Sequence, residues 1–135
     1  MTKYLGLDIG TVRVGVSITD LSGSIAFPMS TFPFDDAIDE ISKVIEIEDI
    51  DQIVVGIPFK LSGKSGQSVE LVESFITKLL LEKPQVTVHK VDERFSTSIA
   101  ENQLKSTNRS PSKSRSIIDQ LAAVNILQTF LDSKR

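Results

Sequence analysis

The chain has 135 residues, 40% of them hydrophobic and 24% charged, and carries a formal net charge of −3. These values are typical of one globular domain, so we expect residues 1–135 to form a single domain. The absence of cysteine excludes disulfides, thiolate metal sites and a cysteine nucleophile.

No apolar run approaches the roughly 20 residues of a membrane helix, so we expect no membrane partner. The N-terminus lacks the charged-then-apolar layout of a signal peptide, and the lack of cysteine fits a reducing compartment. We therefore expect a cytoplasmic protein. The net charge does not by itself indicate nucleic-acid binding, for which a basic patch is the usual footprint, so the distribution of charge matters more than the sum.

The first part of the chain predicts three strands in an antiparallel meander. Residues 4–9 form an apolar run typical of a buried strand, and residues 13–19 alternate and are rich in β-branched side chains. Gly10 would begin the turn between these two strands. Residues 25–32 predict a third strand, which Pro28 places toward a sheet edge.

Helices and strands then alternate. Asp35 or Asp36 can cap a helix that runs to about Ile47. The further elements predicted are a strand over 52–57, a helix over 67–82, a strand over 86–91, a short helix opened by a capping box at 98–101, a polar basic loop over 105–115 and a final amphipathic helix over 117–131. Right-handed crossovers would set the fourth and fifth strands parallel to the first. We therefore predict an α/β fold with a mixed five-stranded sheet flanked by helices, in the ribonuclease-H-like order among a few possible layouts.

Asp8 is a carboxylate within an otherwise apolar strand, and a buried charge is costly unless something binds it. It lies near the carboxyl end of its strand, where open α/β sheets place ligands. Glu93 follows the fifth strand and would reach the same edge if that strand is parallel to the first. If the fourth strand lies between them, Glu93 starts about 9.6 Å from Asp8 and must reach inward. Each of the two residues alone is more simply interpreted as a turn residue or a solvated charge.

Asp119 falls on the apolar stripe of the final helix, with Ala122, Ala123 and Ile126 following at i+3, i+4 and i+7. Its carboxylate would therefore point at the sheet. The alternative is a first-turn aspartate favoured by the helix dipole, with Ser116 as the cap. That alternative explains the position of Asp119 in the turn but not its apolar-facing phase.

Three carboxylates at one sheet edge would repel one another unless a cation neutralises them. Oxygen ligands without cysteine or a histidine pair indicate Mg²⁺ or Mn²⁺. Two such ions about 3.5–4 Å apart can drive phosphodiester hydrolysis, one activating the water and the other stabilising the leaving oxygen. The pattern predicts Asp8, Glu93 and Asp119 as metal ligands and catalytic residues. His89, the only histidine, lies within a strand, where we expect a structural role.

Basic residues surround the predicted acidic site. They are Arg13 and Arg94 near the strand carboxylates, Lys60 and Lys64 after the fourth strand, and Lys105, Arg109, Lys113 and Arg115 before Asp119. A basic rim, that is, basic residues around a cluster of carboxylates, favours binding of the negatively charged nucleic-acid backbone. A solvated flexible loop is the alternative for residues 105–115.

Four blocks of the sequence resemble the YqgF/RuvX family of the ribonuclease-H-like superfamily. They are Leu5-Gly6-Leu7-Asp8-Ile9-Gly10 with Arg13-Val14-Gly15-Val16-Ser17, Val54-Val55-Gly56-Ile57-Pro58 with Gly63, Asp92-Glu93-Arg94-Phe95-Ser96-Thr97, and Asp119-Gln120-Leu121-Ala122-Ala123 with Ile126-Leu127. The resemblance covers nearly the whole chain, and the family's acidic residues carry over onto Asp8, Glu93 and Asp119. Departures from the usual family residues occur at 17–19 and 60–62, and they concern loop contacts rather than the acidic set.

This resemblance implies a metal-dependent endonuclease of the bacterial cytoplasm that acts on structured RNA or branched DNA. Family members are assigned to maturation of the 5′ end of pre-16S rRNA or to resolution of Holliday junctions. Two other classes stay open. Residues 8–11 resemble the first phosphate loop of actin/Hsp70-type ATPases, although this chain supplies only one of the two domains that those proteins close around a nucleotide. A non-catalytic, nucleic-acid-binding ribosome-assembly factor would use the same basic residues. A monomer and a homodimer are both compatible with the sequence.

Overall fold

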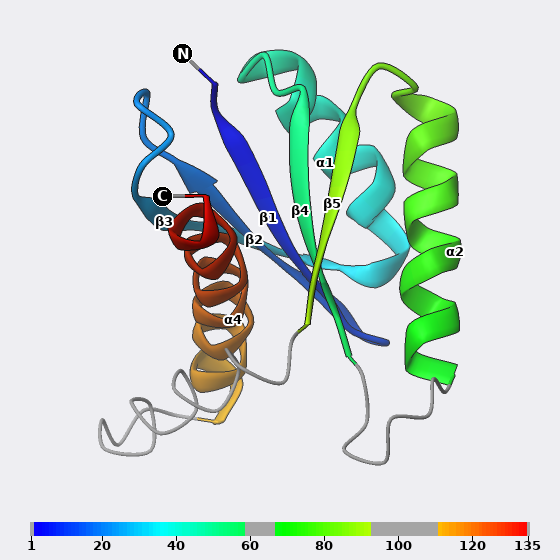
Figure 1. The fold of residues 1–135 in the computed structure, drawn as a ribbon. Helices are drawn as coiled ribbons and strands as arrows, with labels where there is room; N and C mark the ends of the chain where they lie inside the picture. Colours follow the sequence, from blue (N-terminus) through cyan, green and yellow to red (C-terminus); the bar gives the residue numbers. More distant parts are fainter. Residues whose placement is uncertain (1, 59–66, 93–110, 135) are drawn as a thin grey trace.

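A computed structural model describes residues 2–58, 67–92 and 111–134. Five strands form one sheet in the order β3-β2-β1-β4-β5 (Figure 1). The strands are β1 (Tyr4–Ile9), β2 (Arg13–Thr19), β3 (Ala26–Pro33), β4 (Gln52–Ile57) and β5 (Thr87–Asp92). β1, β2 and β3 are antiparallel neighbours, whereas β4 and β5 run parallel to β1. The predicted mixed sheet is confirmed, and Pro28 lies on an edge strand as expected.

The helices cover the two faces of this sheet. α4 (Pro111–Ser133) crosses one face, and α1 (Phe34–Ile47) and α2 (Gln67–Glu82) share the core on the other (Figure 1). Strand residues alternate between these cores: Leu5 and Leu7 pack toward α1 and α2, and Val54 packs with Ile126 under α4. The alternate residues of β1, Asp8 among them, therefore face α4. None of the helices in the described ranges is long and apolar enough to cross a membrane.

Two glycines allow α4 to lie directly on the sheet. A Cβ at Gly6 would stand 2.9 Å from the Ala123 carbonyl oxygen, and a Cβ at Gly15 would stand 2.0 Å from the Asp119 carbonyl oxygen. Only a residue without a side chain permits so close an approach. Ser17 Oγ adds to the contact by donating a hydrogen bond to the Ala123 carbonyl oxygen at 2.7 Å.

α1 begins at Phe34, ahead of the two aspartates that were predicted to cap it. Pro33 holds the N-cap position without a side-chain hydrogen bond, and Asp35 and Asp36 lie inside the first turn. The prediction of an aspartate cap is wrong because the chain enters the helix earlier, where the Phe34 N–H donates a hydrogen bond to the Val12 carbonyl oxygen at 2.9 Å. The two carboxylates instead favour the helix through its dipole.

α4 begins at Pro111, ahead of its predicted start. The prediction of a loop is therefore wrong for residues 111–115, and Lys113 and Arg115 belong to the helix. Proline suits the first helical turn because its fixed φ is helical and the N–H that it lacks would be unpaired there.

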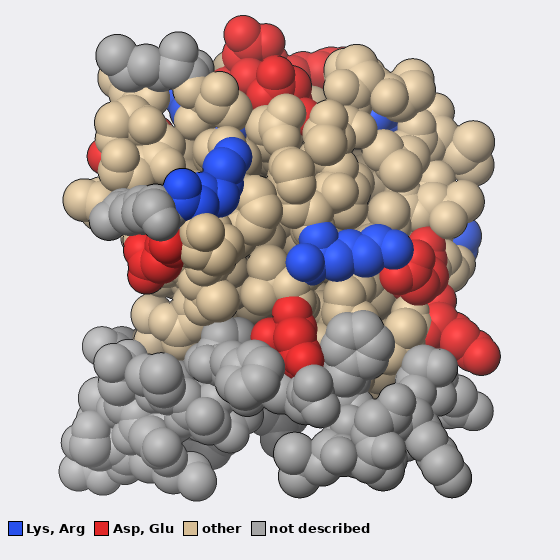
Figure 2. Space-filling view, viewed as in Figure 1, with Lys and Arg blue, Asp and Glu red and all other residues tan. Residues whose placement is uncertain are grey.

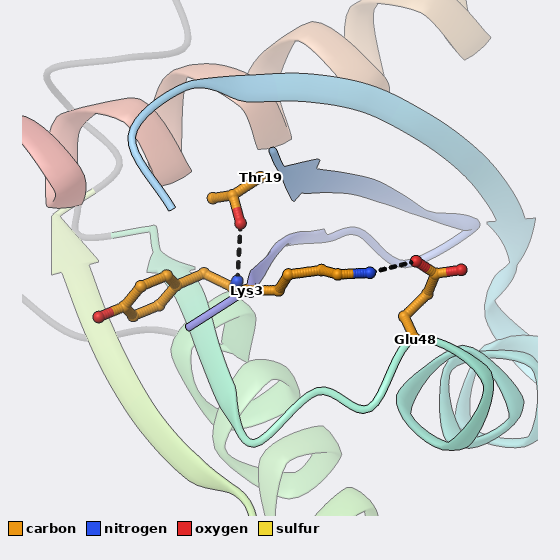
Figure 3. A network of polar contacts seen from close by, with 4 residues as sticks. Lys3, Thr19 and Glu48 are labelled. Carbon is orange, nitrogen blue, oxygen red and sulfur yellow. Dashed lines mark hydrogen bonds and ion pairs between the residues drawn. The ribbon is translucent and has the colours of Figure 1, made fainter. Parts of the chain in front are cut away.

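A polar network ties the amino-terminal edge of the sheet together (Figure 3). The Tyr4 backbone N–H donates a hydrogen bond to Thr19 Oγ1 at 2.9 Å, which joins the start of β1 to the end of β2. Lys3 Nζ donates to Glu48 Oε1 at 2.8 Å, at the end of α1. This edge lies opposite the carboxyl ends of β1, β4 and β5.

An aromatic cluster anchors the last turns of α4 near that edge. Ring centroids lie 5.7 Å apart for Tyr4 and Phe130 and 4.7 Å apart for His89 and Phe130. His89 Nε2 also lies 2.6 Å from Gln52 Oε1. Partial burial, and to a lesser extent the Lys134 ammonium group, lower the pKa of the His89 imidazole from its ordinary value of 6.5.

Acid should destabilise the fold through His89. Because the pKa of His89 is lowered in the folded state, the unfolded chain binds the proton more tightly, and stability is lost as the pH falls below 6.5. The free energy of unfolding, measured by urea denaturation from about pH 8 to about pH 5, should fall more steeply for the wild type than for His89→Phe, which cannot be protonated. Equal slopes for the two proteins would contradict this prediction.

Candidate active site

Asp8 lies near the carboxyl end of β1, on the face that α4 covers. Its cross-strand partner on β2 is Gly15. On the other side, the parallel register pairs Leu7 with Val55, so the next residue of β4, Gly56, lies beside Asp8. The partly buried Asp8 carboxylate thus has a strand neighbour without a side chain on each side, and on the β2 side this lets the backbone of α4 come close.

Asp119 lies in the third turn of α4 and approaches the same place from the helix. A Cβ at Gly15 would stand 2.0 Å from the Asp119 carbonyl oxygen and 3.0 Å from the Asp119 Cβ. The position of Asp119 along α4 excludes a first-turn aspartate capped by Ser116. The apolar-facing phase predicted for Asp119 agrees with the complete burial of Ala123 and Ile126 on the same stripe.

The two aspartates come together across Gly15. Directly opposed strand residues have Cβ atoms about 4.5–5.5 Å apart. Since the Asp119 Cβ stands 3.0 Å from the Cβ position of Gly15, the Cβ atoms of Asp8 and Asp119 lie no more than about 8.5 Å apart. Carboxylates at this separation can share a divalent cation or hold two neighbouring cations.

Arg13, at the start of β2, forms an ion pair with Asp119. Its Nε donates a hydrogen bond to Asp119 Oδ2 at 2.7 Å. The two side chains are 34% and 20% exposed, so the pair is partly shielded from solvent. Arg13 was predicted to contact nucleic acid, whereas here it contacts a predicted metal ligand.

The other predicted site residues lie outside the described part of the chain. Two ranges, 59–66 and 93–110, contain Lys60, Lys64, Glu93, Arg94, Lys105 and Arg109. The side chains of Lys113 and Arg115 are also outside what the structure describes. Within the described ranges, no group of three His, Cys, Asp or Glu residues could hold a metal ion. β4 does lie between β1 and β5, which confirms the two-strand separation expected between Asp8 and the strand that precedes Glu93.

Charged side chains on the α4 face are dispersed among the residues that the structure describes. Figure 2 shows small, separate basic and acidic groups on this side of the molecule rather than one basic stripe. Lys90 of the edge strand β5, whose side chain is directed toward α2, is paired with Glu73 of α2 at 2.8 Å. The predicted basic rim therefore depends mostly on residues beyond the described ranges.

The two aspartates fit a divalent cation on chemical and steric grounds. Both supply hard oxygen donors, which Mg²⁺ and Mn²⁺ prefer. Gly56 leaves the space beside Asp8 free of a strand side chain. Arg13 takes only one oxygen of Asp119 among the described contacts, so the other oxygen can serve a cation.

Sequence reasoning did not single out Gly15, Gly56 or Ser17 as determinants of the site. The signal was present, because glycine inside a strand often marks the close approach of another backbone or a ligand. Only the docking of α4, however, shows which segment makes that approach.

The sheet order and the helices on both faces define an α/β protein of the ribonuclease-H-like fold, with an aspartate pair toward the carboxyl edge of its central strand. The chain is similar to a solved structure of RuvC from Thermus thermophilus, with a TM-score of 0.60 and 12% identity over 98% of this chain and 96% of that one. It is similar to the same organism's RuvC in complex with Holliday junction substrate, with a TM-score of 0.59 over 99% and 96% of the two chains. These likenesses show the fold.

The chain belongs to the RuvX family, whose model, described as Holliday junction resolvase, matches residues 2–133. A relative from Fusobacterium nucleatum is 40% identical over 138 residues and covers all of both chains. A relative from Bacillus thuringiensis is 41% identical over 137 residues, which cover 98% of this chain and 99% of the relative. Both carry the name "Putative pre-16S rRNA nuclease". The family resemblance predicted from the four sequence blocks is confirmed, and with it membership of a nuclease family.

Replacing Gly15 with alanine should displace Asp119 from the sheet. The new Cβ would stand 2.0 Å from the Asp119 carbonyl oxygen, so α4 must lift or β2 must bend. We expect a loss of about 1–3 kcal/mol in the free energy of unfolding, measured by urea denaturation.

Gly10→Ala is the matched control for Gly15→Ala. It lies at the other side of the same hairpin, and among the described residues its Cβ would meet only the Arg13 carbonyl oxygen, at 3.0 Å. A Gly15→Ala protein that is as stable as the wild type, or no less stable than Gly10→Ala, would show that α4 does not press on β2 as described.

Proposed function

We propose that this protein is a metal-dependent endonuclease that hydrolyses phosphodiester bonds, processing the 5′ end of pre-16S rRNA during ribosome biogenesis. The observation that carries the proposal is the convergence of Asp8 and Asp119 across Gly15 in a ribonuclease-H-like sheet. The choice of RNA is supported by the names of relatives that are 40% and 41% identical over nearly their full length.

Asp8, Glu93 and Asp119 are the proposed catalytic residues and ligands of Mg²⁺ or Mn²⁺. When bound, two such ions activate the attacking water and stabilise the leaving oxygen. Asp8 is held by the pairing of β1 with strands on both sides, and Asp119 by the contact of its own backbone with Gly15. Glu93 directly follows Asp92, the last residue of β5, and is the proposed third carboxylate.

Basic side chains would bind the phosphate backbone around these carboxylates. The proposed contacts are Arg13, Lys60, Lys64, Arg94, Lys105, Arg109, Lys113 and Arg115. Such contacts release counterions, so affinity for the substrate should fall steeply with salt.

The proposal treats residues 1–135 as a single nuclease domain of the bacterial cytoplasm. Its partner is nucleic acid, structured RNA or branched DNA, without a membrane partner. Either a monomer or a homodimer is compatible with it, although symmetric cleavage of two strands would favour a dimer.

Two other candidates each have an observation in their favour. The description of the family model favours a resolvase that acts on Holliday junctions in DNA. A non-catalytic ribosome-assembly factor is favoured by the Arg13–Asp119 ion pair, which gives Asp119 a structural partner within the chain itself.

A cleavage assay with purified protein and Mg²⁺ tests the proposal. The wild type should cleave a precursor 16S rRNA fragment in preference to a four-way DNA junction at matched salt. Asp8→Asn and Asp119→Asn keep the shape of each side chain but remove its charge, and each should lower the cleavage rate by at least about a hundredfold.

Asp35→Asn is the matched control, since Asp35 is exposed in the first turn of α1, on the other side of the sheet. It should cleave like the wild type. Unchanged turnover in Asp8→Asn would exclude the assigned site, and preference for the junction would replace the RNA substrate with branched DNA. If the protein binds nucleic acid but cleaves neither substrate, the non-catalytic ribosome-assembly factor becomes the supported function.

A further inference from the structure

The ion pair between Arg13 and Asp119 links two elements that are distant in sequence. The two residues lie 106 positions apart and meet only because α4 packs over β2. Arg13 is itself fixed at the hairpin, since its carbonyl oxygen accepts a hydrogen bond from the Gly10 N–H at 2.9 Å and it pairs with Pro33 on β3. An arginine whose backbone is fixed in this way can hold a carboxylate in a defined orientation.

The geometry of the pair leaves one carboxylate oxygen of Asp119 available to bind a ligand. An arginine that binds a carboxylate in the bidentate mode donates hydrogen bonds to both carboxylate oxygens. Here the contact runs from Nε to Oδ2 alone, and within the described residues Asp119 Oδ1 has no hydrogen-bond partner. Arg13 therefore holds Oδ2 of Asp119, and Oδ1 can accept a ligand.

We propose that Arg13 is a positioning residue that orients Asp119 for a divalent cation, in addition to any contact it makes with substrate phosphate. The inference rests on the proposed function, because it assigns a role toward the same carboxylate site. Asp119 lies close to Asp8, and two like charges turn away from each other unless they are held. Arg13 offsets part of that repulsion and keeps Asp119 in place before the cation arrives. Groups that hold metal ligands in this way typically change metal affinity or activity by about 10- to 100-fold when they are removed.

Calorimetric titration with Mn²⁺ alone, in the absence of nucleic acid, tests this role. Arg13→Gln should weaken Mn²⁺ binding by about 10- to 100-fold. Arg13→Lys keeps the positive charge without the planar fork and should restore part of the affinity. In the cleavage assay, raising the Mn²⁺ concentration should recover kcat for Arg13→Gln, whatever change the loss of a phosphate contact makes to KM for the RNA.

Lys3→Gln is the matched control for this titration. It breaks another partly exposed ion pair, Lys3 with Glu48, at the opposite edge of the sheet (Figure 3). Its Mn²⁺ affinity should equal that of the wild type. A circular-dichroism melt of each variant checks that the fold is kept, and Arg13→Lys carries the test if Arg13→Gln fails to fold.

The outcomes separate this inference from the proposed function. If the wild type binds Mn²⁺ and Asp119→Asn does not, the carboxylate site stands. Unchanged or tighter Mn²⁺ binding by Arg13→Gln would then overturn only the positioning role. A higher KM for RNA with unchanged Mn²⁺ affinity would make Arg13 a phosphate contact alone. A wild type that binds no Mn²⁺, or that binds it equally well after Asp119→Asn, would overturn both.

Discussion

The direct contact of α4 with the sheet is the constraint on which the candidate site depends. At Gly6 and Gly15 the helix backbone approaches the strands so closely that even a methyl group would clash. This contact sets the height of Asp119 above β2, and through Gly15 it sets the separation of Asp119 from Asp8. A helix held farther away by ordinary side chains would remove the carboxylate from the site.

Polar side chains set where α4 lies along the strands. Ser17 Oγ donates to the Ala123 carbonyl oxygen at 2.7 Å, and Gln128 Oε1 accepts a hydrogen bond from the Ala26 N–H at 2.9 Å. The two ends of the helix then differ in chemistry. The end with Asp119 lies against Gly15, the strand partner of Asp8, whereas the end with Phe130 is packed into an aromatic cluster. The aromatic packing and the proposed reactive groups thus occupy opposite ends of one element.

The sheet and most of the helices could be predicted from the sequence because each has a clear apolar period. Asp119 was found in the same way, since its helical phase matches that of Ala123 and Ile126. The start of α4 could not be predicted, because its first turns have no apolar period and Pro111 is compatible with both a loop and a helix. The Arg13–Asp119 ion pair could not be predicted either, since 106 residues separate its members. Only the packing of α4 against β2 brings them together.

The central claim is that Asp8 and Asp119 form one divalent-cation site. Paramagnetic broadening of amide NMR signals by substoichiometric Mn²⁺ tests it most directly, because broadening falls off steeply with distance from the ion. The account predicts that the signals of Asp8, Gly15 and Asp119 are lost first, while those of Lys3 and Thr19 at the opposite edge of the sheet stay sharp. Uniform broadening, or earlier loss of the Lys3 and Thr19 signals, would contradict the account.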